Sequence, residues 1–136
     1  YSDVLLMYAE AMCEYNGAPS EELYNVILPI RERAGVSTEP FAKYATLEKF
    51  RQFIRNERAR ELCFEGLRKF DLLRWGIYLD SMNEVASLAV TDSNWGTSTA
   101  KNYITLVDRL GEKNNCLPIP SLELAVNTEL KQNPLW

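Results

Sequence analysis

Apolar positions recur at helical spacing through the first half of the chain. Residues 3–16 carry apolar side chains around most of a helical circumference. The polar positions in this stretch are few: Asp3, Glu10, Glu14 and Asn16. Gly17 follows, and glycine is the usual residue just beyond a helix end. The pattern predicts a helix that must be covered on more than one side.

A second helix is predicted directly after this one. Ser20 suits the N-cap position, and acidic residues follow it in the first turn. The helix is expected to run to Ala34 and to stop at Gly35. Pro29 lies inside it and is expected to kink or split it. The two helices and their short connection predict an αα-hairpin.

A long third helix is predicted from Leu47 to Glu65, with Thr46 as its N-cap and Gly66 as its stop. At 100° per residue, several apolar residues share one broad face: Leu47, Phe50, Phe53, Ile54 and Phe64. Glu57 and Glu61 fall on that same face. The helix is therefore expected to bury two carboxylates together with its apolar side chains.

The second half of the chain has weaker periodicity. Two short helices are expected, over residues 68–75 and 77–89. Residues 90–115 predict a long loop rich in Asn, Ser and Thr, within which Tyr103 to Val107 suits a short strand. The prolines in residues 117–120 require an extended backbone, and Ser121 is expected to cap a last helix. The elements predicted from the pattern are mostly α, with one helical hairpin and long loops.

Composition removes several classes of function. The 136 residues carry a net charge of −4, and the basic residues are scattered among acids, so no nucleic-acid groove is expected. The absence of histidine excludes Ser-His-Asp and Cys-His catalysis and every metal site that needs imidazole. Cys13, Cys63 and Cys116 are far apart and form no CxxC pair, so we interpret them as small buried residues. We expect no metal and no cofactor.

The densest group of charges surrounds Glu57 and Glu61. Two carboxylates four residues apart resemble a general acid/base pair. Like charges at this spacing repel each other, however, and a buried carboxylate needs a cation. The nearby candidates are Arg58, Arg68 and Arg74, with Arg31 and Arg33 on the second helix. We interpret the group as a structural ion network between helices and expect no catalytic residue.

Trp95 and Tyr103 are candidates for ligand contact. Both lie in the polar segment 90–115, and an aromatic side chain on a loop can serve as a platform for a sugar ring. They can equally fold back into the core, and the sequence leaves both alternatives open. No Gly-rich phosphate motif lies near them.

Several segments, taken in order, resemble the C-terminal portion of the SusD/RagB-like family of outer-membrane nutrient-binding lipoproteins. The strongest similarity is the run from Ile54 to Leu62 with Phe64, Glu65 and Gly66. The others are residues 3–11, 30–35, 70–72, 74–76, 117–120 and 132–134. Residues 77–115 carry little of the resemblance. Residues 1–136 are accordingly identified as one domain portion, whose N-terminal part lies outside this sequence.

The resemblance implies a mostly α fold that contains TPR-like helix pairs. It implies a protein exposed at the cell surface and held in the outer membrane by a lipid anchor upstream of this sequence. It implies a SusC-like TonB-dependent transporter as partner and an oligosaccharide as ligand, although some relatives bind peptides. The main ligand aromatics of the family lie largely upstream, so no binding residue is carried over from it.

Two other functions remain as alternatives. A helical-repeat module could bind peptides or proteins, which ligand screening of the full-length protein would reveal. A glycoside hydrolase could use Glu57, Glu61 or Asp71, which an activity assay on matched glycans would reveal. Fold alone does not decide among these functions.

Overall fold

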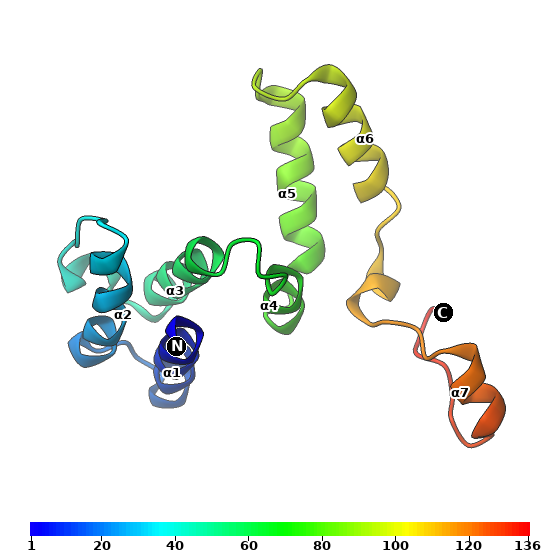
Figure 1. The fold of residues 1–136 in the computed structure, drawn as a ribbon, viewed down its shortest axis with the longest axis horizontal. Coiled ribbons are helices and arrows are strands. Elements are labelled where there is room, and N and C mark those ends of the chain that lie inside the picture. Colours follow the sequence, from blue (N-terminus) through cyan, green and yellow to red (C-terminus); the bar gives the residue numbers. More distant parts are fainter. The chain divides into compact units, whose positions relative to one another are not determined.

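The computed structural model describes residues 1–136, and all of its regular structure is helical (Figure 1). The α-helices are α1 (Ser2–Asn16), α2 (Glu21–Arg33), α3 (Leu47–Glu61), α4 (Arg68–Arg74), α5 (Tyr78–Thr91), α6 (Thr97–Val107) and α7 (Ser121–Val126). Two short 3-10 helices are η1 (Phe41–Tyr44) and η2 (Glu112–Asn115). The chain divides into two compact units, Tyr1–Arg68 and Lys69–Trp136. The predicted mostly α fold class is confirmed.

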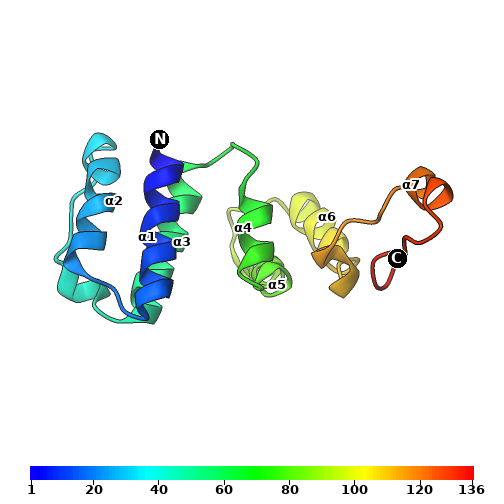
Figure 2. The same cartoon turned by 90° about the horizontal axis from the view of Figure 1, so that it is seen from below.

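In the first unit, α1 packs against both α2 and α3 (Figure 2). The ends of these helices follow local rules. Gly17 ends α1 with a φ of 67°, a conformation that glycine adopts without strain. Ser20 accepts a hydrogen bond from the Leu23 amide at the start of α2, and Thr46 accepts one from the Lys49 amide at the start of α3. The predicted hairpin and both predicted caps are confirmed.

The core of the first unit is formed by one face of each helix. Its buried members are Leu6, Ala9, Cys13, Leu23, Tyr24, Ile27, Ile30, Phe50, Phe53 and Ile54. The outer face of α1 is also apolar, and Val4, Met7, Tyr8 and Tyr15 are exposed there. The helix is thus apolar around most of its circumference, as predicted, while α2 and α3 cover one side of it. No helix of the chain has both the length and the apolar character that crossing a bilayer requires.

Aromatic side chains hold η1 against the helices. The Tyr44 ring stacks on the Phe53 ring, with centroids 4.3 Å apart and an interplanar angle of 29°. The centroid of the Tyr24 ring lies 5.8 Å from that of Tyr44 and 5.5 Å from that of Phe53, so the three rings form one cluster. The Tyr24 hydroxyl also donates a hydrogen bond to the Glu39 carbonyl. These contacts fix the path of the segment between α2 and α3.

In the second unit, α5 and α6 form an antiparallel hairpin (Figure 1). Few residues of this unit are buried: Asp71 and Leu72 on α4, Tyr78 and Ala89 on α5, and Ala100 and Val107 on α6. The short helix α7 buries none. Burial of apolar surface is the main stabilising term in folding, so this unit has less of it to hold it together than the first unit.

The prediction of a long loop over residues 90–115 is wrong. Helix α5 continues to Thr91, and α6 occupies residues 97–107, including the stretch expected as a strand. Ala100, Ile104 and Val107 recur at helical spacing and face α5, and this packing outweighs the β-branched residues between them. Within residues 90–115, only the short segments next to α6 and η2 have irregular backbone.

Several boundaries also differ from prediction. Helix α2 is not split at Pro29, because burial of Leu23, Ile27 and Ile30 holds both sides of the proline in one helix. Helix α3 ends at Glu61 rather than Glu65, and Phe64 turns outward with a φ of 66° and full exposure.

Three side chains also differ from prediction. Ser121 is the first residue of α7 and makes no capping hydrogen bond, because Pro120 occupies the N-cap position. The prediction of buried cysteines is right for Cys13 and wrong for Cys63 and Cys116, which are exposed. Both lie in irregular segments outside the helix faces that form the cores.

Candidate functional site

The tip of the α5–α6 hairpin brings Trp95 and Tyr103 together. Trp95 lies in the connection between the two helices, and Tyr103 lies on α6. Their ring centroids are 5.5 Å apart at an interplanar angle of 68°, an edge-to-face arrangement that aromatic pairs prefer. Both side chains are half-buried. The pair is therefore partly packed and partly accessible.

Tyr103 faces the inside of the hairpin. Its hydroxyl lies 3.8 Å from the Met82 sulfur on α5, to which it donates a weak hydrogen bond. Burial raises the pKa of the Tyr103 hydroxyl, and the neighbouring Tyr78 adds to the effect. Tyr103 therefore packs against the Trp95 indole from the inner side of the hairpin. Of the two residues, Trp95 is the one placed to contact a ligand.

A hollow of about 400 Å³ lies beside Trp95. Its walls include Ala100 and Ile104 of α6 together with the polar side chains of Thr97 and Lys101. The turn next to it is held by Asp92, whose carboxylate accepts hydrogen bonds from the backbone and side-chain amides of Asn94 at 2.9 and 2.8 Å. An aromatic wall with nearby hydroxyl and ammonium groups has the composition of a small-ligand site.

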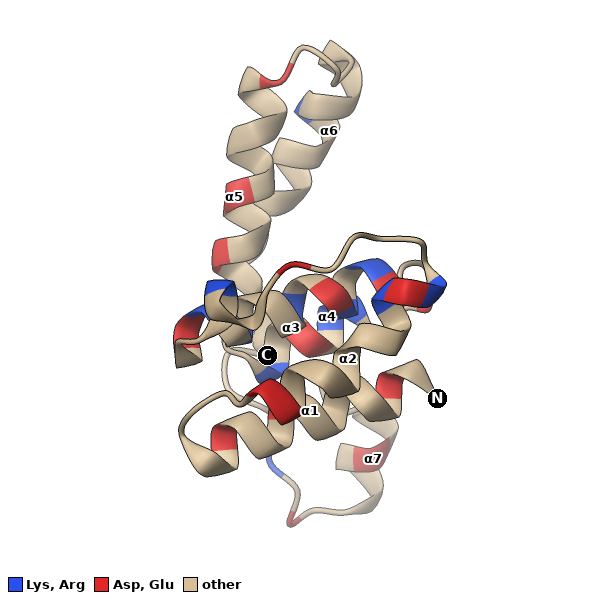
Figure 3. Ribbon diagram, turned by 90° about the vertical axis from the view of Figure 1, so that its left-hand side faces the viewer, with Lys and Arg blue, Asp and Glu red and all other residues tan.

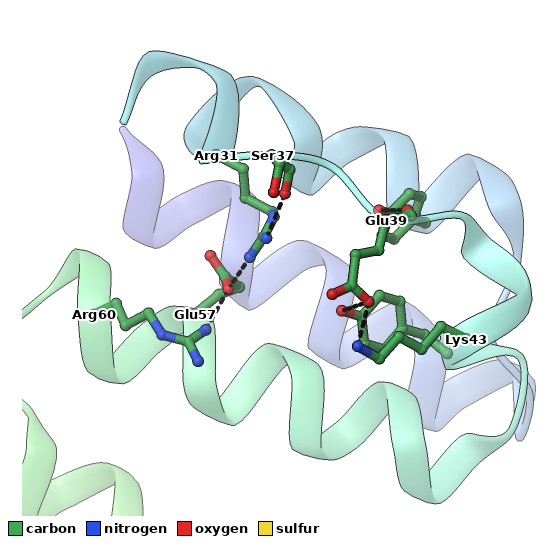
Figure 4. A network of polar contacts seen from close by, with 8 residues as sticks. Arg31, Ser37, Glu39, Lys43, Glu57 and Arg60 are labelled. Carbon is green, nitrogen blue, oxygen red and sulfur yellow. Dashed lines mark hydrogen bonds and ion pairs between the residues drawn. The ribbon is translucent and has the colours of Figure 1, made fainter. Parts of the chain in front are cut away.

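The carboxylate of Glu57 is buried between α2 and α3 (Figure 4). It accepts hydrogen bonds from Arg31 of α2 and, at 2.6 Å, from Arg60 one turn along α3. Arg31 also donates to the Ser37 carbonyl at 2.9 Å. One carboxylate therefore joins α2, α3 and the segment after α2. Arg60 is absent from the sequence prediction, although its position three residues after Glu57 could have identified it.

The other members of the predicted ion network have their own contacts. Glu61 is half-buried and pairs with Arg33 of α2. Arg58 is buried and donates to the Asp3 carboxylate of α1 at 2.8 Å. These pairs tie all three helices of the first unit together.

The remaining two arginines lie further along the chain. Arg68 donates to the Arg55 carbonyl at 3.2 Å. Arg74 pairs with the buried carboxylate of Asp71 at 2.9 Å and lies over the Trp75 ring, 4.8 Å from its centroid. The Asp71 carboxylate, the third candidate for an acid catalyst, therefore has a cation at the same helix end.

A groove of about 810 Å³ opens beside Glu57. It lies between the end of α2, the segment that contains η1, and α3. On the η1 side, Glu39 pairs with Lys43, and this hydrogen bond holds the pKa of the Glu39 carboxyl below its usual value. Burial raises the pKa of the Tyr44 hydroxyl, which donates to Glu39 at 3.4 Å. Figure 4 shows the Arg31–Glu57–Arg60 and Glu39–Lys43 clusters on two sides of this space.

Charge is distributed unevenly over the helices. Figure 3 shows acidic and basic residues close together along α2 and α3, whereas the α5–α6 hairpin is mostly uncharged. The first unit therefore offers charged and aromatic groups around one groove, and the second offers an aromatic pair beside a small hollow.

Comparisons with known proteins agree on one family. The model of the SusD family matches residues 1–136. The chain is 35% identical over 133 residues to the SusD-like protein P25 of Formosa agariphila, covering 97% of this chain and 22% of that protein. It is also similar to a crystal structure of a SusD homolog from Bacteroides thetaiotaomicron, with a TM-score of 0.78 and 34% identity.

The matched region is a minor part of these relatives. The solved homolog is matched over 100% of this chain and 26% of its own. The chain therefore spans about a quarter or less of the length of the proteins it matches.

Proposed function

The chain belongs to the SusD family. We therefore propose that the full-length protein binds oligosaccharide nutrients at the cell surface without altering them. The single observation that supports this most strongly is the family match over residues 1–136. The proposal places the protein in the outer membrane, held by a lipid anchor outside residues 1–136. It makes a SusC-like TonB-dependent transporter the partner to which the glycan is delivered.

Trp95, in the connection between α5 and α6, is proposed to contact the ligand or the transporter, with Tyr103 of α6 packed behind it. Trp95 supplies an aromatic face, and sugar rings bind to such faces through their own apolar face. Tyr103 holds the indole through the edge-to-face contact at 5.5 Å. The position of Trp95 in the wall of a hollow of about 400 Å³ supports this role.

The acidic residues are proposed to be structural rather than catalytic. Glu57 already binds Arg31 and Arg60, Glu61 binds Arg33, and Asp71 binds Arg74. Each contact joins helices or braces a helix end, and removal of the cation would leave a buried carboxylate uncompensated. A glycoside hydrolase would instead present two carboxyl groups to a substrate from opposite sides of the scissile bond.

Co-purification tests the partner in this proposal. The full-length protein, tagged and expressed in its native host, is solubilised in mild detergent and isolated. We expect a TonB-dependent transporter barrel to accompany it in a stable ratio. Isolation of the protein in the soluble periplasmic fraction, with no barrel attached, would contradict both the location and the partner.

A further inference from the structure

The groove of the first unit has a polar stripe along α3. Lys49, Gln52, Asn56 and Arg60 all line it, and their spacing of three and then four residues places them on one helix face. From Lys49 to Arg60 this stripe is about 16 Å long. Basic groups stand at its two ends and amides in its middle. The Gln52 amide nitrogen donates to the Asn56 side-chain oxygen at 3.0 Å, which leaves the other polar atoms of both amides for a ligand.

Beside the Glu39–Lys43 pair, the wall formed by α2 and η1 also has an aromatic and aliphatic part. The half-buried Tyr44 ring is stacked on Phe53 and lines the space together with Ile30 and Val36. A ring held in this way from behind has little freedom to lose when a ligand packs on it. The groove therefore offers a fixed apolar surface opposite the polar stripe.

The charges around the groove do not balance. Three carboxylates, those of Glu39, Glu57 and Glu61, are paired with four cations. Glu57 alone is shared by two arginines. Lys49 is a further cation in the lining and is exposed. Arg33 pairs with Glu61 from outside the groove. The lining residues alone carry four cations and three carboxylates, a surplus of one positive charge, which favours an anionic ligand.

A separate feature also indicates an incomplete site. Arg31 lines the groove, its side chain is nine-tenths buried, and its Nε has no hydrogen-bond partner. Its Nη atoms already donate to Glu57 and to the Ser37 carbonyl. A buried donor without an acceptor is costly, so an acceptor brought close to this guanidinium would be favoured.

We propose that this groove binds a short oligosaccharide that carries carboxylate groups. The carboxylates of the ligand bind Lys49 and the two guanidinium groups that share Glu57. Its hydroxyls form hydrogen bonds with Gln52 and Asn56, and one face of a sugar ring packs on Tyr44. An acidic peptide shares the charge but not the density of hydroxyls that the paired amides suit. The inference rests on the proposed function, since it names the class of glycan and a binding site for it in this unit.

Calorimetric titration of the full-length protein tests this site. The probe is trigalacturonate, and its neutral counterpart is the trimethyl ester. We expect trigalacturonate to bind more tightly than the ester and to weaken as salt rises. Lys49→Met should weaken trigalacturonate binding about fivefold, because one exposed charge contact is lost. The matched control Lys131→Met removes an exposed lysine outside the groove and should leave binding unchanged.

Each other outcome overturns the inference in a distinct way. Equal binding of the acid and the ester, or acid binding that Lys49→Met leaves unchanged, removes the groove as its site. Lys49-dependent binding of an acetylated triglutamate peptide, without trigalacturonate binding, assigns the groove to acidic peptides. Binding of neutral glycans alone overturns this inference and leaves the proposed function standing. Failure to bind any glycan overturns the proposed function as well.

Discussion

Arg31 donates a hydrogen bond through Nη1 to the Glu57 carboxylate and so joins the end of α2 to α3 across 26 residues of sequence. Both side chains are about nine-tenths buried. Removing one member of such a pair leaves the other as an uncompensated buried charge, which is far more costly than losing an exposed ion pair. The contact also forms one wall of the groove in the first unit.

The first prediction concerns the stability of this pair. Glu57→Gln should lower the free energy of opening of α2 and α3 by about 3 kcal/mol, because two guanidinium groups lose their shared negative partner. Native-state hydrogen exchange of the 136-residue chain, read at amides of these helices, measures that free energy.

The neighbouring exposed pair provides the control. Arg33→Gln removes a contact to Glu61 from a side chain that is 65% exposed, so it should cost less than about 1 kcal/mol. Equal exchange in Glu57→Gln and the parent chain would show that the buried pair is not a structural link.

The second prediction is a pH dependence at the other end of the same helices. Arg51 donates to both oxygens of the Glu14 carboxylate, at 2.5 and 2.6 Å, and links α3 to α1. These hydrogen bonds hold the pKa of the Glu14 carboxyl below its usual value of 4.5. A lowered folded-state pKa contributes stability that is present above the usual value and is lost as pH falls through the folded value.

Thermal unfolding at two pH values measures this contribution. Arg51→Met should lower the midpoint of the first unit at about pH 7 and by less at about pH 2, because the contribution of this pair is lost as pH falls through the lowered folded-state pKa of Glu14. The effect should be modest, because the pair is exposed to solvent. A destabilisation of the same size at both pH values would mean that Arg51 acts through packing of its stem instead.

The third prediction concerns thiol reactivity. Cys13 is 1% exposed, and burial raises the pKa of its thiol, so it should be alkylated slowly. Cys63 and Cys116 are exposed and should be alkylated quickly. Peptide mass spectrometry of the 136-residue chain after brief iodoacetamide treatment measures all three. Alkylation of Cys13 as fast as Cys63 would show that the core around α1 is not formed.

The fourth prediction concerns the hairpin tip. Trp95→Ala in the full-length protein should weaken oligosaccharide or transporter binding about fivefold, because one aromatic stacking surface is lost. Tyr15→Ala is the matched control, since it removes an aromatic side chain that is 86% exposed on α1. Affinities for glycan and transporter that both remain unchanged in Trp95→Ala, with the fold intact, would leave the hairpin tip without a binding role.

The sequence predicted the features that depend on local rules. The caps at Ser20 and Thr46 and the stops at Gly17 and Gly35 follow from residue type, and each is present in the structure. Burial of Glu57 follows from its position on the apolar face of α3. The helical pattern predicted a mostly α chain, and the family resemblance implied the same class together with TPR-like helix pairs, because its segments occur in order along most of the chain.

The features that were missed depend on contacts between distant segments. The wall of the groove formed by Tyr44 exists because Tyr24 and Phe53 hold η1 in place, and no periodicity within residues 36–45 records this. Helix α6 was missed because the Asn, Ser and Thr residues of this stretch indicated a loop and Tyr103 to Val107 a short strand, whereas packing of Ala100 and Val107 stabilises a helix. Arg60, the second basic partner of Glu57, could have been predicted from the sequence, because residues three apart are neighbours on a helix surface.

The proposed binding function is tested by calorimetry of the full-length protein with a panel of oligosaccharides, followed by chromatography of the same samples. We expect saturable binding of at least one class of glycan and recovery of that glycan at its original length. Shortened products that disappear in Glu57→Gln or in Asp71→Asn would contradict it by showing catalysis. Absence of binding to every glycan, together with tight binding of peptides, would contradict it by placing the protein among peptide-binding helical modules.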